Sequence, residues 1–229
     1  TSNFSQVSDF IRLYDMDVLV IGPEAPLVDG LVDHLREQSE FDDLVIFGPS
    51  AEGAKLEGSK AFAKEFMQAN GIPTAAYRKF DASQIDEGVA YIRDHALPIV
   101  LKADGLAAGK GVLILNDREE AVTEFKAMLD GKFGSAGERV VIEQFLDGIE
   151  FSVFAITDGS DYTLLPIAKD YKRIGEGDTG LNTGGMGSVS PVPFVTDELM
   201  EKVVSRIVDP TIKGIHDREI DYKGVVFFG

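Results

Sequence analysis

The sequence has no cysteine, which excludes disulfides, thiolate metal sites and cysteine nucleophiles. It also lacks any apolar run close to the ~20 residues that a membrane span needs, and the polar stretch Thr1–Asp9 has no signal-peptide pattern. Its three histidines, His34, His95 and His216, lie far apart with no carboxylate at ligand spacing, so we predict neither a zinc site nor a catalytic triad. These absences favour a cytoplasmic protein with no membrane partner.

Positive charge is also scarce: the sequence has 22 Lys and Arg but 39 Asp and Glu, which gives a formal net charge of −17. Such a surface repels phosphates over most of its area, which argues against a nucleic-acid partner. A protein of this charge that binds a small phosphorylated ligand must gather its basic residues locally. The 229 residues, 44% of them hydrophobic, suffice for a globular protein of one large or two smaller domains.

Short apolar runs closed by turn residues predict strands, and apolar residues at helical spacing predict helices. A strand over 17–23, a helix over 27–35 and a strand over 44–47 together predict a parallel α/β unit. The next predicted elements are a helix over 59–70, an extended segment over 74–80, a helix over 83–94, strands over 98–102 and 111–115, and a helix from 117. The last are strands over 140–142, 151–157 and 162–168, a glycine-rich loop over 170–193, a helix from 196 and an apolar strand over 224–229.

Three of these helices have predicted caps. Ser59 precedes a helix whose Ala63, Phe66 and Met67 share a face, Asp117 with Glu120 resembles a capping box before another, and Thr196 caps the last.

The first motif with chemical meaning is KADGLAAGKG, from Lys102 to Gly111, between two predicted strands. Its glycines let the backbone come close to a ligand and turn its amides towards phosphate oxygens, while Lys102 and Lys110 add positive charge. It is not a Walker motif, because no Ser or Thr follows Lys110 and a strand follows where a helix should start. The alternative is a flexible hairpin loop with solvated lysines.

Two further motifs lie downstream. In VIEQFLDGIE, from Val141 to Glu150, a strand runs into a turn between carboxylates, which suits an adenine edge and a ribose but also an ordinary edge strand. From Asp170 to Gly187, Lys172 and Arg173 adjoin a stretch too rich in glycine for helix or regular strand. Long loops of this kind are usually functional, and the two cations suit a sugar phosphate or carboxylate. The alternative is a disordered loop.

These motifs, in this order, resemble the phosphoribosylamine–glycine ligase (glycinamide ribonucleotide synthetase) family of the ATP-grasp superfamily. The stretches that carry the resemblance are GPEAPL from Gly22, IFGPSAEGAKLEGSKAF from Ile46, KADGLAAGKGV from Lys102, EQFLDGIEFS from Glu143 and DYKRIGEGDTGLNTGGMGSVSP from Asp170. The resemblance implies a mixed α/β (α+β) chain with an ATP-grasp fold, preceded by part of a Rossmann-like parallel α/β domain. It implies a carbon–nitrogen ligase of purine biosynthesis that uses ATP with Mg²⁺ or Mn²⁺ to join glycine to 5-phosphoribosylamine through a glycyl phosphate.

The resemblance also assigns roles to residues. It implies catalytic roles for Lys102, Lys172 and Arg173. It implies ATP contacts for Lys60, Lys102, Gly105, Ala108, Gly109, Lys110, Gly111, Glu143, Phe145, Leu146 and Glu150. Substrate contacts are implied for Pro23, Glu24, Asp170, Lys172, Thr183, Gly184, Gly185, Met186 and Gly187.

The same resemblance predicts a partial N-terminal domain over 1–56 and an ATP-grasp domain over 57–229, with a mobile ATP-binding subdomain over 73–145. Both ends of the family pattern are missing, so we expect a fragment truncated at its C-terminus, with the metal ligands beyond Gly229. Alternatives are a non-catalytic ATP-binding fragment and another ATP-grasp carboxylate–amine ligase. Whether the protein is a monomer or a dimer stays open.

Overall fold

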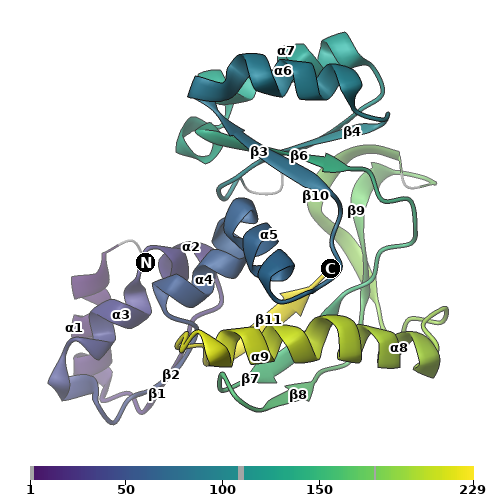
Figure 1. The fold of residues 1–229 in the computed structure, drawn as a ribbon. Helices are drawn as coiled ribbons and strands as arrows, with labels where there is room; N and C mark the ends of the chain where they lie inside the picture. Colours follow the sequence, from purple (N-terminus) through teal and green to yellow (C-terminus); the bar gives the residue numbers. More distant parts are fainter. Residues whose placement is uncertain (1–2, 108–110, 178) are drawn as a thin grey trace. The chain divides into compact units, whose positions relative to one another are not determined.

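A computed structural model describes residues 3–107, 111–177 and 179–229, which form two compact units (Figure 1). One unit comprises the chain up to Gly58 together with Val153–Pro166 and Val195–Phe228. The other comprises Ser59–Ser152 and Ile167–Phe194, with Gly229. No helix in the described ranges is long and apolar enough to cross a membrane.

The second unit contains a four-stranded antiparallel sheet in the order β3-β6-β4-β5. Its strands are β3 (Tyr77–Asp81), β4 (Ile99–Ala103), β5 (Val112–Leu115) and β6 (Arg139–Gln144). Alternate residues of the inner strands are apolar and fully buried, among them Leu101 and Ile142, because side chains along a strand point to opposite faces in turn. On that face lie α6 (Ile85–Asp94) and α7 (Arg118–Ala127), whose Ile92 and Phe125 complete the core (Figure 1).

Local capping explains where the helices of this unit begin. The Ser59 hydroxyl accepts from the amide of Phe62 at the start of α5 (Lys60–Ala69), which confirms that predicted cap. Asp117 accepts from the amide of Glu120 at the start of α7, which confirms the N-cap half of the predicted capping box. The remaining short helical segments of the unit are η2 (Ala82–Gln84), the π-helical turn η3 (Met128–Lys132) and η4 (Gly134–Gly137).

The segment predicted as a loop over 170–193 is instead an antiparallel ribbon, so that prediction is wrong. It consists of β9 (Lys169–Gly175) and β10 (Thr179–Val189), which pair from Lys169↔Val189 to Gly175↔Thr179. The pairing register shifts twice along β10, and Gly180 and Gly185 have φ values of 84° and 127°. Glycine tolerates such angles, so an irregular strand can absorb glycines that a regular strand would exclude.

The first unit contains a two-stranded parallel sheet, β1 (Val18–Val20) beside β2 (Val45–Phe47), which confirms the predicted parallel arrangement. The single helix predicted over 27–35 is two helices separated at Gly30, whose φ of 89° breaks the run. The helical segments around this sheet are α1 (Phe4–Tyr14), α2 (Glu24–Val28), α3 (Leu31–Arg36), η1 (Ser39–Phe41) and α4 (Ala51–Gly58). Neither α1 nor α4 was predicted from the sequence.

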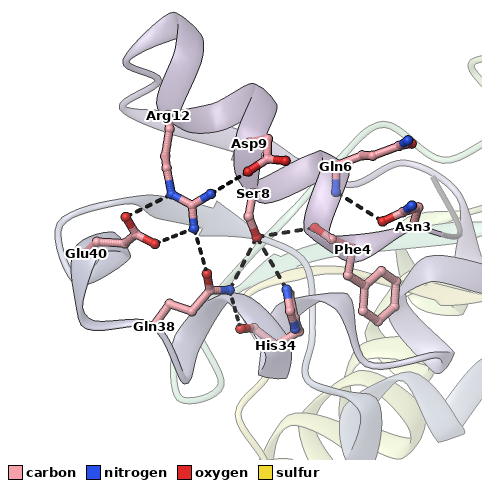
Figure 2. Close-up of polar contacts among 9 residues, drawn as sticks. All are labelled: Asn3, Phe4, Gln6, Ser8, Asp9, Arg12, His34, Gln38 and Glu40. Carbon is pink, nitrogen blue, oxygen red and sulfur yellow. Dashed lines mark hydrogen bonds and ion pairs between the residues drawn. The ribbon is translucent and has the colours of Figure 1, made fainter.

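Helix α1 is held to its neighbours by a polar network around Arg12 (Figure 2). The guanidinium donates to Glu40 at 2.9 Å, to Asp9 at 2.7 Å and to the side chain of Gln38 at 3.2 Å. The hydrogen bond from Arg12 holds the pKa of the Glu40 carboxyl below its ordinary value. These exposed contacts tie α1 to the segment before β2 and leave the apolar face of α1, with Ile11, to the core.

The same unit holds a second sheet in the order β11-β7-β8. Its strands are β7 (Val153–Thr157), β8 (Tyr162–Leu164) and β11 (Gly224–Phe228), and the helical segments of this part are α8 (Asp197–Val203), the π-helical turn η5 (Val204–Val208) and α9 (Asp209–Asp217). The Gly48 amide donates to Lys223 at 2.6 Å and the Ser50 amide to Asp221 at 2.9 Å, which joins the end of β2 to the approach to β11.

Candidate functional site

Two charged side chains lie on the face of the four-stranded sheet opposite α6 and α7. Lys102 of β4 pairs in register with Val141 of β6, and Glu143 lies two residues further along β6, so the two side chains are diagonal neighbours. Lys102 Nζ lies 2.9 Å from Glu143 Oε2. The alternation that buries Leu101 and Ile142 under the helices therefore aims Lys102 and Glu143 the other way.

Lys60 reaches the same region from the first turn of α5. Its Nζ donates to the carbonyl of Gly105 at 3.1 Å, and among the described residues it forms no ion pair. Burial lowers the pKa of Lys60 below its ordinary value, the Lys102 charge acts in the same direction, and the Asp104 and Glu143 charges oppose them. Because this half-buried ammonium is hydrogen-bonded to a neutral carbonyl and not to a carboxylate, it can still bind an anion.

Asp104 connects the start of α5 to the end of β4. One carboxylate oxygen accepts from the Ala61 amide at 2.7 Å and from the Ser59 hydroxyl at 3.0 Å, and the other lies 3.5 Å from Arg139. The Lys60 amide also donates to the Asp104 carbonyl at 3.1 Å. Asp104 therefore fixes the position of Lys60 relative to the strand that bears Lys102, a function that the motif alone did not show.

The glycine-rich loop is described in part, since Ala108, Gly109 and Lys110 lie outside the described residues. At its base the Ala103 amide donates to Gly111, and the Gly105 amide donates to the carbonyl of Ala136 at 3.2 Å. The Gly105 amide is thus engaged within the protein rather than turned towards a ligand. A Cβ on Gly105 would lie 2.9 Å from the Ala136 Cα, so close packing against another backbone explains glycine at this position.

Glu143 is buried, with 4% of its surface exposed, and a second lysine contacts it. Lys64 Nζ lies 3.2 Å from the same carboxylate oxygen that Lys102 contacts. Lys64 was not among the site residues predicted from the sequence, although it lies one helical turn after Lys60 and so on the same face of the helix. The carboxylate expected to line adenine is therefore packed between two lysines, and its contact with adenine stays a prediction.

Phe145 and Leu146 follow directly after β6 and differ in surroundings. Phe145 is half-buried and lines a cavity of about 520 Å³, while Leu146 is 64% exposed. The other residues that line this cavity are Ala76, Tyr91, Asp94, His95, Ala96, Leu97, Pro98 and Gln144. An adenine contact for Phe145 and Leu146 stays a prediction.

A second cluster joins the ribbon to the segment after β6. Lys172 Nζ lies 2.6 Å from Glu150 and 3.5 Å from Asp170, and the Thr183 hydroxyl donates to the Lys172 carbonyl at 2.9 Å. Burial lowers the pKa of Lys172, but the hydrogen bonds and charges of Glu150 and Asp170 outweigh it and raise the pKa above its ordinary value. Four of the predicted site residues thus lie together here.

The other predicted residues are more scattered. Arg173 is half-buried on β9, and on β10 Gly184, Gly185, Met186 and Gly187 are exposed. The Gly185 amide donates to the Thr183 hydroxyl at 3.1 Å.

Two predicted substrate residues belong to the first unit. Pro23 and Glu24 are exposed at the start of α2, where Pro23 is the N-cap. Their substrate contacts stay predictions.

A serine and a histidine that the sequence analysis did not connect lie within hydrogen-bond distance in the first unit. Ser8 Oγ is 3.3 Å from His34 Nε2, and Ser8 also donates to the Phe4 carbonyl and accepts from Gln38 (Figure 2). Ser8 is only 2% exposed, so no substrate can reach its hydroxyl. The pair is a structural contact between α1 and α3, not a nucleophile with its base.

Comparisons with known proteins agree with this arrangement. The family model described as the phosphoribosylglycinamide synthetase N domain matches residues 1–57, and the model of the ATP-grasp (A) domain of the same synthetase matches residues 58–229. A phosphoribosylamine–glycine ligase of Rhizobium meliloti is 47% identical over 229 residues, which is 100% of this chain and 53% of that protein. The chain thus spans about half the length of the curated relatives it matches.

Solved structures are similar as well. The crystal structure of phosphoribosylamine–glycine ligase from Thermotoga maritima has a TM-score of 0.74 at 39% identity, covering 80% of this chain and 46% of that one. Carboxyaminoimidazole ribonucleotide synthase from Aspergillus clavatus, at 16% identity and a TM-score of 0.68, covers 99% of this chain and 52% of that one, and shares the fold alone. Because family models match its whole length and its lysines and glycine loop lie on an ATP-grasp scaffold, the chain belongs to the phosphoribosylglycinamide synthetase family.

Proposed function

We propose that the protein of which this sequence forms part joins glycine to 5-phosphoribosylamine at the expense of ATP. The carboxylate of glycine takes the γ-phosphoryl group of ATP, which gives glycyl phosphate and ADP. The amine of 5-phosphoribosylamine then attacks the acyl carbon, loses a proton and expels phosphate, which leaves an amide. Support comes from family membership and from relatives named as phosphoribosylamine–glycine ligases.

The observation that carries the ATP-binding part is the arrangement of Lys60 and Lys102. In a protein of net charge −17, two lysines lie at the base of one glycine-rich loop, one of them without an ion-pair partner among the described residues. Phosphoryl transfer needs positioning and neutralisation of charge rather than a covalent nucleophile, and lysines on a rigid sheet and a helix start supply both.

The cluster of Glu150, Asp170, Lys172 and Thr183 supports a place for the other substrates. Lys172 forms ion pairs with both Glu150 and Asp170, so an anionic or hydroxylated ligand can replace one of these carboxylates as its partner. We keep catalytic roles for Lys102, Lys172 and Arg173 as part of this proposal.

The described residues give no comparable support for binding of a divalent metal ion. The described residues contain no group of three or more His, Asp or Glu that could hold a metal ion.

The test begins with calorimetric titration of ATP into the chain. We expect saturable binding, and we expect Lys102→Met to weaken it by about tenfold or more, since a charged hydrogen bond to phosphate is lost. Lys79→Met is the matched control, because Lys79 of β3 lies in the same sheet and pairs with an exposed carboxylate, Glu65 of α5. Unchanged affinity in Lys102→Met would count against the phosphate role.

The reaction itself is tested with a protein as long as the matched relatives. We expect ADP to form when glycine and 5-phosphoribosylamine are both present. ADP formation with a different carboxylic acid and none with glycine would overturn the substrate assignment and leave only a related ATP-grasp ligase. ATP binding by the 229-residue chain without turnover would support the alternative that this part is an ATP-binding module.

A further inference from the structure

Lys64 is a buried cation that the proposed reaction does not use. It is 6% exposed on α5, and its ammonium donates to the Thr74 hydroxyl at 2.7 Å and lies 3.2 Å from Glu143. It also lies over the Tyr77 ring, 5.6 Å from the centroid. Burying an ammonium is costly unless it is paired, so this lysine needs a reason to be there.

Glu143 shows what Lys64 provides. One carboxylate oxygen contacts both Lys64 and Lys102, while the other accepts no hydrogen bond from the described residues. The two lysines therefore form all the ion pairs that the described part of the chain offers to a carboxylate with 5% of its side chain exposed. If one lysine leaves, the other is the remaining ion-pair partner.

Only one of the two lysines can reach a ligand. The side chain of Lys102 is 28% exposed, whereas that of Lys64 is 8% exposed and is held by Thr74 as well. A ligand phosphate above the sheet can therefore draw Lys102 from Glu143, but it cannot draw Lys64.

We propose that Lys64 is a positioning residue: it is the fixed counterion of Glu143, which frees Lys102 to leave that carboxylate for the phosphates of ATP. This inference rests on the proposed ATP-binding function. Without the charge of Lys64, Glu143 would be a buried carboxylate with Lys102 as its one described partner. It would then hold Lys102 against the pull of the ligand, because an unpaired buried charge is costly. Burial lowers the pKa of Lys64 below its ordinary value, the Lys102 charge acts in the same direction, and the charge and hydrogen bond of Glu143 oppose that shift.

The experiment is a double-mutant cycle on the ATP dissociation constant, measured by calorimetry with the whole chain. Lys64→Met should weaken ATP binding by about tenfold. In the Glu143→Gln background the same change should have an effect below about threefold, because a neutral amide does not retain Lys102. Lys64→Arg, which keeps the charge, should restore most of the affinity, and Lys79→Met is again the matched control.

Each result decides between a positioning and a purely structural role. Equal weakening by Lys64→Met in both backgrounds, or full affinity in a folded Lys64→Met variant, would overturn the inference. If Lys64→Met does not fold, Lys64→Gln takes its place, since it can keep the hydrogen bond to Thr74 while it removes the charge. Full affinity in Lys64→Gln would then overturn the inference. Failure of the unmodified chain to bind ATP would instead refute the proposed ATP-binding function, and the inference with it.

Discussion

Gly88 offers a sharp test of how tightly the helical layer of the second unit is packed. It lies in the middle of α6, and a Cβ added there would lie 2.3 Å from Cζ and 2.6 Å from Cε1 of Phe125. Phe125 is fully buried, and its ring meets that of Phe80 edge-on at 5.9 Å between centroids. The ring therefore has no open space into which it can retreat.

Gly88→Ala brings two opposing effects. Alanine favours the helix by about 1 kcal/mol relative to glycine. The overlap with the Phe125 ring is overpacking of a filled core, which costs roughly 1–3 kcal/mol. Because the closest atoms are well inside contact distance, we take the upper part of that range and expect a net loss of about 1–2 kcal/mol in the free energy of unfolding.

Urea unfolding followed by circular dichroism measures this change, and Phe125→Leu shows its cause. Leucine lacks the ring atoms that the new Cβ would meet, so in that background Gly88→Ala should be neutral or stabilising by up to about 1 kcal/mol. Ala90→Gly, at an exposed position of the same helix, gives the helix-propensity effect alone. A stabilising Gly88→Ala in the unmodified chain, or the same cost in both backgrounds, would refute this reasoning.

Two more predictions concern single contacts. Asp104→Ala should lower the unfolding free energy by about 2 kcal/mol, because two hydrogen bonds to a carboxylate are lost, and urea unfolding measures this loss. The same change should weaken ATP binding, because Lys60 is no longer held in place, and calorimetry measures the affinity. An unchanged affinity would show that Asp104 does not position Lys60. The hydrogen bond to Asp209 raises the pKa of Tyr162 to about 12 in the folded protein. In the unfolded chain this tyrosine ionises from about pH 10. The folded state therefore loses stability as the pH rises above about 10. Between pH 9 and 11 Tyr162→Phe should therefore lose about 1 kcal/mol less unfolding free energy than the unmodified chain, and identical losses would contradict the assignment.

The parts of the fold that the sequence predicted are those in which local and long-range preferences agree. The strands of the four-stranded sheet and the caps Ser59 and Asp117 follow from apolar alternation and from side chains that bond their own backbone. Helix α1 was not predicted, although Phe4, Val7 and Ile11 recur at helical spacing and the Asn3 side chain accepts from the Gln6 amide at its start. What the apolar pattern does not show is that the same buried face holds a polar residue, Ser8, which the Phe4 carbonyl and His34 satisfy.

The candidate site shows the same limit. The face of α5 predicted to be buried carried Ala63, Phe66 and Met67, yet the structure buries Lys64 beside Phe66. A lysine in a buried stripe contradicts the helical pattern unless its partner is known, and its partner, Glu143, is 79 positions further along the chain. The loop lysines were predictable from their glycine neighbours, whereas contacts between distant residues required the three-dimensional structure.

The order β3-β6-β4-β5 places both β4 and β6 inside the sheet. Lys102 and Glu143 therefore sit on strands that neighbours hydrogen-bond on both sides, and a local opening that displaced either would have to break two ladders at once. Little of the binding energy of a ligand is then spent on arranging these charges, because the backbone that bears them is already fixed. In this part of the site, the adjustment on binding falls to the side chain of Lys102.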